Sequence, residues 1–121
     1  MTTIVLADDH HVVRQGLRAL LEVETDFSVV GEAADGLEVA GLVERLEPDV
    51  LIVDVMMPGL GGLEVTRQVR QRCPTTRVVI LSMYEARDWT QPTLEAGASA
   101  FLTKGVSAGQ LLTAVRRAAR A

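Results

Sequence analysis

The sequence predicts a doubly wound α/β domain, in which helices cover both faces of a parallel β-sheet. With 121 residues, the chain has the length of one domain with a single core. Short runs rich in Val, Ile and Leu alternate with longer stretches in which apolar residues recur with helical spacing. The short runs lack the polar alternation of a half-exposed strand, so we expect the strands to be buried on both faces. Strands that alternate with helices favour right-handed crossovers and therefore a parallel sheet.

Five apolar runs are the predicted strands. They cover residues 3–7, 27–30, 50–54, 78–81 and 100–103. The third run, VLIVD, ends on an aspartate, and the chain breaks shortly afterwards at Pro58-Gly59. A buried strand that ends on a charge marks the edge of the sheet as the place to look for function. In doubly wound sheets, ligands bind beyond the carboxyl ends of the strands, where the winding direction reverses.

The stretches between the strands are predicted to be amphipathic helices. Three of them carry apolar residues at helical intervals, which are Val13, Leu17, Leu20 and Leu21; Val39, Leu42, Val43 and Leu46; and Ala108, Leu111, Leu112 and Val115. The pairs Asp35-Gly36 and Gly61-Gly62 supply turns before two helices, and Ser107 with Gln110 forms a capping-box pattern before the last.

Pro92 predicts a shortened fourth helix. A proline inside a helix removes a hydrogen bond and clashes with the preceding turn, but it is tolerated in the first turn. We therefore expect this helix to begin near Gln91-Pro92 and to end by Gly97, after a long loop over residues 84–90 that carries Trp89.

Composition excludes several classes of protein. No apolar run approaches the ~20 residues of a membrane span, the N-terminus has no basic segment typical of a secretory signal, and the single Cys73 forms no internal disulfide. We therefore expect a cytoplasmic protein without a membrane partner. The net charge is −4, without a basic block. This charge argues against DNA binding by this chain alone.

Polar residues stand at or just beyond four of the five strand ends. They are Asp8 and Asp9, Asp54, Ser82, and Lys104. A single charge at a strand end is most often a solvated terminus, but four such ends on one sheet indicate a site. Three carboxylates in one cleft raise one another's pKa, which is costly unless a cation neutralises them.

Magnesium suits these residues, because it takes oxygen ligands and typically uses one or two carboxylates together with a phosphate oxygen. Asp54 is then a candidate carboxylate nucleophile that forms an acyl phosphate. Lys104 would stabilise phosphoryl charge, and Ser82 would donate a hydrogen bond to a phosphoryl oxygen.

Four segments resemble the receiver domain of bacterial two-component response regulators, particularly the NarL/FixJ (LuxR-type) subclass. They are VLADDHHVVRQGLRALLE, VLIVDVMMPGLGGLEV, VVILSMYEARD and LEAGASAFLTKG, and the resemblance covers essentially the whole chain. It implies a flavodoxin-like sheet of strand order 2-1-3-4-5. It also implies that residues 1–121 form one receiver domain, whereas any C-terminal helix-turn-helix output domain is absent from this chain.

The resemblance also implies a role for each site residue. Asp54 corresponds to the phosphorylation site, and Lys104 to the phosphate-binding lysine. The implied magnesium ligands are Asp8, Asp9, Asp54 and the backbone carbonyl of Met56. Ser82 and Phe101 match the switch positions. Met56 and Tyr84 match positions that tune the lifetime of the phosphoryl group.

The activity implied by the resemblance is that of a signalling switch rather than a metabolic enzyme. A sensor histidine kinase would donate the phosphoryl group to Asp54, and the domain would hydrolyse it again. Phosphorylation would alter the face made by the fourth helix, the fifth strand and the fifth helix. The expected output is transcription through a DNA-binding domain, while homodimerisation on phosphorylation is left open.

Three alternatives compete with this interpretation. A haloacid dehalogenase-like phosphatase also forms an aspartyl phosphate, but it requires a second aspartate two residues after the nucleophile, where this chain has Met56. A flavodoxin-like cofactor carrier is disfavoured by an aromatic content of only 3% and by the lack of a phosphate-cradling loop after the first strand. A receiver that no longer accepts phosphate is disfavoured by the intact acidic and lysine positions.

Other candidate residues receive simpler interpretations. His10 and His11 lie beside the acidic pair, but we expect them to be solvated rather than metal ligands. Cys73 is expected to be an inert thiol at a helix end. We expect the arginines at positions 116, 117 and 120 to form a solvated face of the last helix.

Overall fold

The computed structural model describes residues 1–82, 90–103 and 105–120. Strands and helices alternate along the chain as predicted. The elements are β1 (Thr2–Ala7), α1 (His11–Glu22), β2 (Phe27–Ala33), α2 (Gly36–Leu46), β3 (Val50–Asp54), α3 (Gly62–Arg72), β4 (Arg77–Ser82), α4 (Thr90–Ala96), β5 (Ala100–Thr103) and α5 (Ala108–Arg120).

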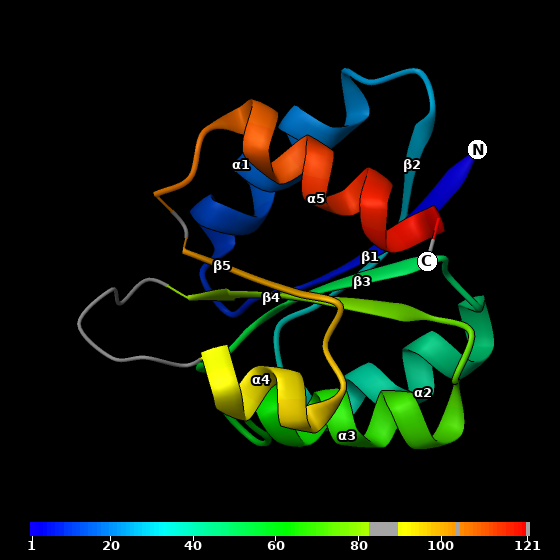
Figure 1. Ribbon diagram of the computed structural model, residues 1–121, viewed down its shortest axis with the longest axis vertical. Helices are drawn as coiled ribbons and strands as arrows, with labels where there is room; N and C mark the ends of the chain where they lie inside the picture. The colour runs from blue at the N-terminus through cyan, green and yellow to red at the C-terminus, as the bar shows by residue number, and fades with distance from the viewer. Residues whose placement is uncertain (83–89, 104, 121) are drawn as a thin grey trace.

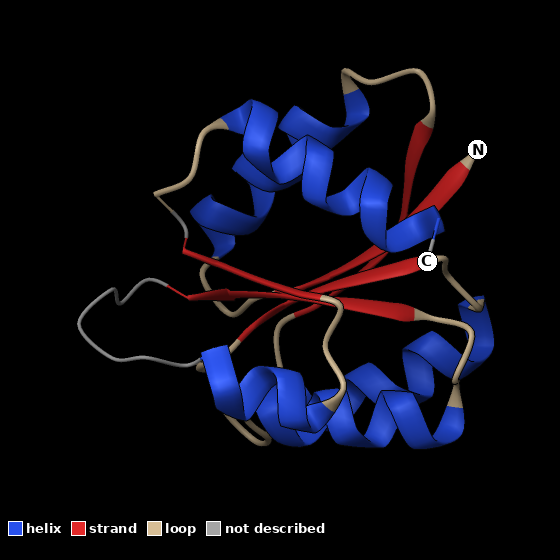
Figure 2. Cartoon of the chain, in the orientation of Figure 1, coloured by secondary structure: helices blue, strands red, loops and turns tan. Residues whose placement is uncertain are grey.

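The strands form one parallel sheet in the order β2-β1-β3-β4-β5. Helices α1 and α5 cover one face of the sheet, and α2, α3 and α4 cover the other (Figure 1). Figure 2 shows the same three layers, with the strands between two groups of helices. Both the doubly wound fold and the expected strand order are confirmed. Within the described part of the chain, none of the helices combines the length and the apolar character needed to cross a membrane.

Strand β3 shows why the central strands are apolar throughout. All its residues are buried. Leu51 and Val53 belong to the core beneath α2 and α3, while Val50 and Ile52 belong to the core beneath α1 and α5. Because successive side chains of a strand point to opposite faces, a strand between two helical layers needs apolar residues at every position.

The expectation of burial on both faces is wrong for the two edge strands. Side chains of β5 are all partly exposed, and those of β2 range from buried to exposed, because an edge strand has a neighbour on one side only. Strand β2 also extends to Ala33, three residues beyond its predicted end. Gly31 and Glu32 end the apolar run, but their backbones continue to pair with β1.

Helix α4 is short, as Pro92 predicts. It spans Thr90–Ala96, with Pro92 in its first turn, and the chain leaves it at Gly97 with a φ of 101°. Its start lies one residue before the predicted Gln91. Apart from Thr90, the predicted loop over residues 84–90 lies outside the described residues, and so does Trp89.

The predicted capping box is present at α5, and the two predicted turn pairs stand at the starts of α2 and α3. The Gln110 backbone N–H donates to the Ser107 hydroxyl at 3.1 Å, and the Ser107 N–H donates to the Gln110 side chain at 3.0 Å. This reciprocal pair is the capping box read from the sequence. Asp35 caps α2 by accepting a hydrogen bond from the Leu37 N–H at 2.7 Å, and Gly61 is the N-cap residue of α3.

Arg116 is not merely part of a solvated face, although Arg117 and Arg120 are exposed as expected. Its guanidinium lies 2.6 Å from Glu24 and 3.1 Å from Asp26. It also lies 4.9 Å from the centroid of the Phe27 ring, a cation–π distance. These partners precede or begin β2, so Arg116 joins the last helix to an edge of the sheet.

This contact predicts a loss of stability in acid. The hydrogen bond from Arg116 lowers the pKa of Asp26 below its ordinary value of 3.8. Because the folded-state pKa is the lower one, the contribution is complete above the unfolded-state pKa and is lost as the pH falls through the folded-state pKa. In urea unfolding, the advantage of the wild type over Asp26→Asn should therefore shrink between about pH 6 and about pH 3. The advantage over Arg116→Ala should shrink in parallel, whereas Arg117→Ala should behave like the wild type. An advantage of Asp26 that stays constant with pH would contradict the assignment.

Candidate functional site

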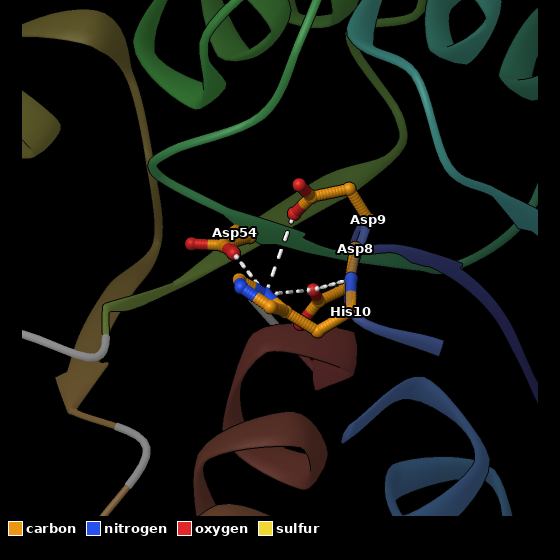
Figure 3. A group of neighbouring side chains, drawn as sticks. All are labelled: Asp8, Asp9, His10 and Asp54. Atoms are coloured by element: carbon orange, nitrogen blue, oxygen red, sulfur yellow. Dashed lines mark hydrogen bonds and ion pairs between the residues drawn. The ribbon is translucent and has the colours of Figure 1, made fainter. Parts of the chain in front are cut away.

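Asp8 and Asp54 leave the sheet side by side. Strands β1 and β3 are parallel neighbours, and Ala7 is paired with Val53, so the next residue of each strand lies at the same level. By the alternation along a strand, both aspartates belong to the face of the sheet covered by α1 and α5. Figure 3 shows Asp54 beside the turn that carries the acidic pair.

The three predicted carboxylates converge on one pocket. One oxygen each of Asp8, Asp9 and Asp54, together with a ring nitrogen of His10, all lie within 4.8 Å of one another. Asp8 and Asp54 are each 2% exposed, whereas the Asp9 side chain is 33% exposed. Clustered carboxylate oxygens next to an open side fit the preference of Mg²⁺ for hard oxygen ligands and retained water.

His10 is exposed, as expected, but its ring also lies against the pocket carboxylates, which the sequence did not predict. Its Nδ1 lies 3.0 Å from Asp8, 3.3 Å from Asp9 and 3.5 Å from Asp54, although 48% of the side chain remains exposed. His10 is the N-cap residue of α1 and has an extended backbone. It therefore lies just before the first helical turn. His11 is exposed, as expected.

Backbone hydrogen bonds orient the two buried aspartates. The His10 N–H donates to the Asp8 carboxylate at 2.8 Å, and the Met56 N–H donates to the Asp54 carboxylate at 3.1 Å. In each case the donor lies two residues further along the chain, so each loop turns back over its own aspartate. This arrangement directs the carboxylates into the pocket.

The loop after β3 is held close beneath Asp54. The Gly62 N–H donates to the Val55 carbonyl at 2.9 Å, and Gly59 adopts a φ of 80°. A Cβ at Gly62 would clash with the Asp54 carbonyl oxygen and lie 2.8 Å from the Val55 Cα. The glycine is therefore required for close approach of two backbone segments.

Ser82 and Phe101 lie on neighbouring strands at the same end of the sheet. Ser82 is the fully buried last residue of β4 and pairs with Thr103 of β5. Phe101 pairs with Ile80, two residues before Ser82, and packs against the core beneath α2 and α3. The alternation along the strands thus brings Ser82 and Phe101 to the same face of the sheet. Met56 is 53% exposed.

Two predicted site residues lie outside the described part of the chain. They are Lys104, which follows Thr103 of β5 in sequence, and Tyr84. Cys73 is half-buried at the end of α3, and burial raises the pKa of its thiol. A raised pKa disfavours the reactive thiolate, in agreement with the expected inert role.

Sequence reasoning missed an ion-pair network behind the pocket. Glu32 of β2 pairs with Arg14 and with Arg18, both on α1. Burial alone would raise the pKa of Glu32, but the hydrogen bonds from Arg18 and Arg14 outweigh it, and the net shift is downward. Glu32 therefore carries its charge at neutral pH. The i, i+4 spacing of the two arginines places them on one side of α1, but nothing local identifies their partner on β2.

Comparison with known proteins agrees with the geometry. The family model for the response regulator receiver domain matches residues 4–116. The chain is 38% identical over 120 residues to the transcriptional regulatory protein LiaR of Bacillus subtilis, covering 99% of this chain and 57% of that protein. This chain therefore spans little more than half the length of that relative.

Solved structures show the same similarity. A LuxR-family two-component response regulator from Aurantimonas sp. superposes with a TM-score of 0.93 at 36% identity, covering 99% of this chain and 86% of that one. The receiver domain of the putative response regulator NarL from Mycobacterium tuberculosis also gives a TM-score of 0.93, at 33% identity, covering 98% and 96% of the two chains. The chain belongs to the receiver domain family of two-component response regulators, among relatives of the NarL/LuxR type.

Proposed function

We propose that this chain is a phosphorylation-dependent switch that accepts a phosphoryl group on Asp54 from a sensor histidine kinase, with Mg²⁺ as cofactor. The observation that carries the proposal is the convergence of Asp8, Asp9 and Asp54 within 4.8 Å at the carboxyl ends of β1 and β3. A stable protein tolerates such a cluster of acids where a cation neutralises it. Family membership supports the same function.

Each side chain of the pocket has a distinct part in the proposed reaction. A carboxylate oxygen of Asp54 attacks phosphorus, the phosphohistidine nitrogen leaves, and an acyl phosphate forms on Asp54. Asp8, Asp9 and Asp54, with the Met56 carbonyl, are the residues that would hold Mg²⁺. Bound there, the ion would polarise phosphoryl oxygens and offset the negative charge. Lys104 is proposed to bind a phosphoryl oxygen as an ammonium group.

Burial of Asp54 serves this chemistry. Strand β3 is packed on both faces, so it holds the carboxylate in one orientation. The Met56 N–H donates a hydrogen bond to one carboxylate oxygen of Asp54. This bond orients the carboxylate and favours attack by the remaining lone pairs. The lifetime of the acyl phosphate is proposed to depend on the side chains of Met56 and Tyr84, as the family resemblance implies.

The proposed switch operates through Ser82 and Phe101. A phosphoryl group adds charge and three acceptor oxygens, to which the Ser82 hydroxyl moves and donates. Because Phe101 lies on the same face of the sheet two positions along the neighbouring strand, it packs into the space that Ser82 vacates. The surface of α4, β5 and α5 then changes from one conformational state to another. A free-energy difference of only a few kcal/mol between the two states is enough for this change.

The output is proposed to lie outside the described domain. LiaR is a transcriptional regulatory protein, and this chain covers only 57% of its length. We propose that the altered surface controls a DNA-binding domain in the full-length protein, and that the protein acts in the cytoplasm. A dehalogenase-like phosphatase or a flavin carrier is not favoured, because the family match covers nearly the whole chain.

Metal dependence of labelling tests the function. Incubated with acetyl phosphate and MgCl₂, the wild-type protein should gain the mass of one phosphoryl group. Excess EDTA should reduce the labelled fraction at least about tenfold, because removal of the cation leaves the acids repelling an anionic donor. Intact-protein mass spectrometry measures both values. Equal labelling with and without magnesium, or none under either condition, would rule the proposal out.

A further inference from the structure

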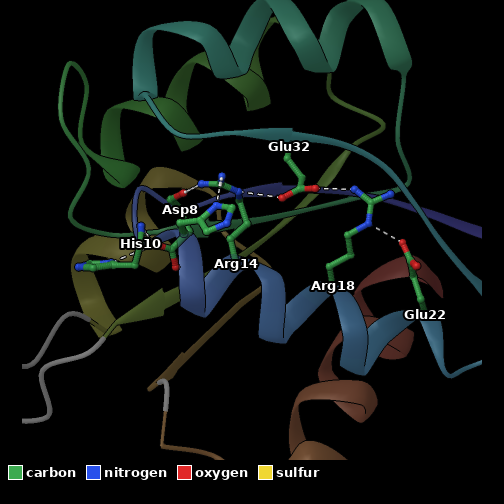
Figure 4. A network of polar contacts seen from close by, with 7 residues as sticks. Asp8, His10, Arg14, Arg18, Glu22 and Glu32 are labelled. Atoms are coloured by element: carbon green, nitrogen blue, oxygen red, sulfur yellow. Dashed lines mark hydrogen bonds and ion pairs between the residues drawn. The ribbon is translucent and has the colours of Figure 1, made fainter.

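Arg14 joins three elements directly behind the acidic pocket. It lies near the start of α1, and its side chain is only 14% exposed (Figure 4). One guanidinium nitrogen, Nη1, donates to the backbone carbonyl of Asp8 at 2.5 Å, and Nε donates to Glu32 at 2.8 Å. A single forked group thus connects α1 to the end of β1 and to β2.

The fork acts on the backbone that carries the acidic pair. The Asp8 N–H donates to the Ala33 carbonyl at 3.0 Å, while the Asp8 carbonyl accepts from Arg14. The hydrogen bond from Arg14 therefore fixes the carbonyl group of the peptide that joins Asp8 to Asp9. Because that peptide is planar, holding its oxygen also fixes the direction in which Asp9 leaves the strand.

Because Glu32 pairs with Arg14, we expect Arg14 to act on the Asp8 backbone through the geometry of its hydrogen bonds rather than through its positive charge. One of its oxygens accepts from Arg14 and the other from Arg18 (Figure 4). The carboxylate offsets the charge of Arg14, so the guanidinium is not a free cation that would repel a metal ion. Arg18 continues to Glu22 at 2.6 Å on the surface of α1 and makes no contact with the Asp8 backbone that the structure records.

We infer that Arg14 is a positioning residue, which fixes the Asp8–Asp9 turn in the geometry that binds the divalent cation, with Glu32 as its anchor. The inference rests on the proposed function, because it concerns the cation that this pocket would hold. Mg²⁺ demands near-ideal octahedral geometry, so a small displacement of one carboxylate weakens binding. Loss of a residue that orients metal ligands typically costs 10–100-fold in affinity.

The test compares Arg14→Gln with the wild type in a titration with MgCl₂ alone, followed by calorimetry or by the amide signals of Asp8 and Asp9. The Kd for Mg²⁺ should rise about tenfold. In labelling by acetyl phosphate, the magnesium concentration for half-maximal rate should rise by the same factor. The rate at saturating magnesium should stay within about twofold, because Arg14 does not contact the reacting atoms.

Two further variants separate geometry from charge. Arg14→Lys keeps the positive charge but cannot donate along two fixed directions, so its Kd should remain raised about tenfold. Arg18→Gln removes the same charge from the same helix and the second partner of Glu32, yet leaves the bond to Asp8. Its Kd should stay within about twofold of the wild type.

Thermal unfolding of each variant shows whether it is folded at the temperature of the titration. If Arg14→Gln is unfolded, Glu32→Gln decides, because it removes the charged anchor of the fork while keeping an acceptor. Its Kd should rise about threefold.

Several results would overturn the inference. The first is a Kd for Mg²⁺ that is unchanged in Arg14→Gln, or in Glu32→Gln if Arg14→Gln is unfolded. The second is a wild-type Kd in Arg14→Lys. The third is a Kd in Arg18→Gln that is raised as much as in Arg14→Gln. A wild type that binds magnesium and is labelled while Arg14→Gln behaves identically refutes the positioning role alone. A wild type that neither binds magnesium nor becomes labelled refutes the proposed function and this inference together.

Discussion

Asp54→Asn is expected to abolish phosphoryl labelling of the domain. The substitution replaces a carboxylate nucleophile by a neutral amide of nearly the same shape, which does not form an acyl phosphate. The fold should survive, because the change removes one of three clustered charges and therefore relieves repulsion within the pocket. Intact-protein mass spectrometry after incubation with acetyl phosphate and MgCl₂ should show only the unmodified mass, and thermal unfolding should show a midpoint no lower than that of the wild type.

Asp35→Asn provides the matched control for this substitution. Asp35 caps α2 by accepting from the Leu37 N–H, and asparagine is an equally good cap. The charge change is identical, but the residue is not one of the pocket carboxylates, so labelling should equal that of the wild type. Labelling of Asp54→Asn at wild-type stoichiometry would move the phosphorylation site to another residue.

Gly62→Ala is expected to destabilise the domain by about 3 kcal/mol, against the usual trend for glycine in a helix. An alanine in place of glycine normally stabilises a helix by roughly 0.5–1 kcal/mol. Here the added methyl group would overlap the Asp54 carbonyl oxygen and approach the Val55 Cα to 2.8 Å. Both are backbone atoms of the end of β3, so neither moves without distorting the strand that presents Asp54. Urea unfolding measures the loss of free energy.

Gly41→Ala should change stability in the opposite direction. Gly41 is an exposed residue of α2, and a Cβ built on it meets no atom within 4 Å. The free energy of unfolding should therefore rise by up to about 1 kcal/mol. If both variants were stabilised, the close approach of α3 to the end of β3 would be refuted. If both lost stability equally, the effect would belong to glycine replacement in general.

The elements of this fold were predictable because their signals are local. A strand buried between two helical layers reads as a continuous apolar run, as in Val50–Asp54, and an amphipathic helix repeats its apolar residues every three or four positions. Capping pairs such as Ser107 with Gln110 are equally local. The edge strand β2 was predicted three residues too short. Its last residues are held by pairing with β1 rather than by burial of apolar side chains.

The gathering of the pocket acids also followed from order along the chain. In a parallel sheet all carboxyl ends meet at one edge, so the order of elements along the chain predicts that Asp8 and Asp54 lie together. The place of Lys104 in the pocket stays a prediction, since that residue lies outside the described ones. The contacts of His10 were not predictable, because they depend on the extended backbone of a single residue before α1.

The sequence by itself determined the layer architecture, the order of elements and the chemical types of residue at the strand ends, because each depends on the local period of apolar side chains. Only the tertiary structure decided which distant charges meet. Arg14 contacts Glu32 and the Asp8 carbonyl. Arg116 contacts Glu24 and Asp26, which lie about three quarters of the chain length away in sequence. Such long-range pairs produce no periodic pattern in the sequence. A charged side chain can be satisfied by water or by any of several opposite charges, and the packing of helices on the sheet selects one of them.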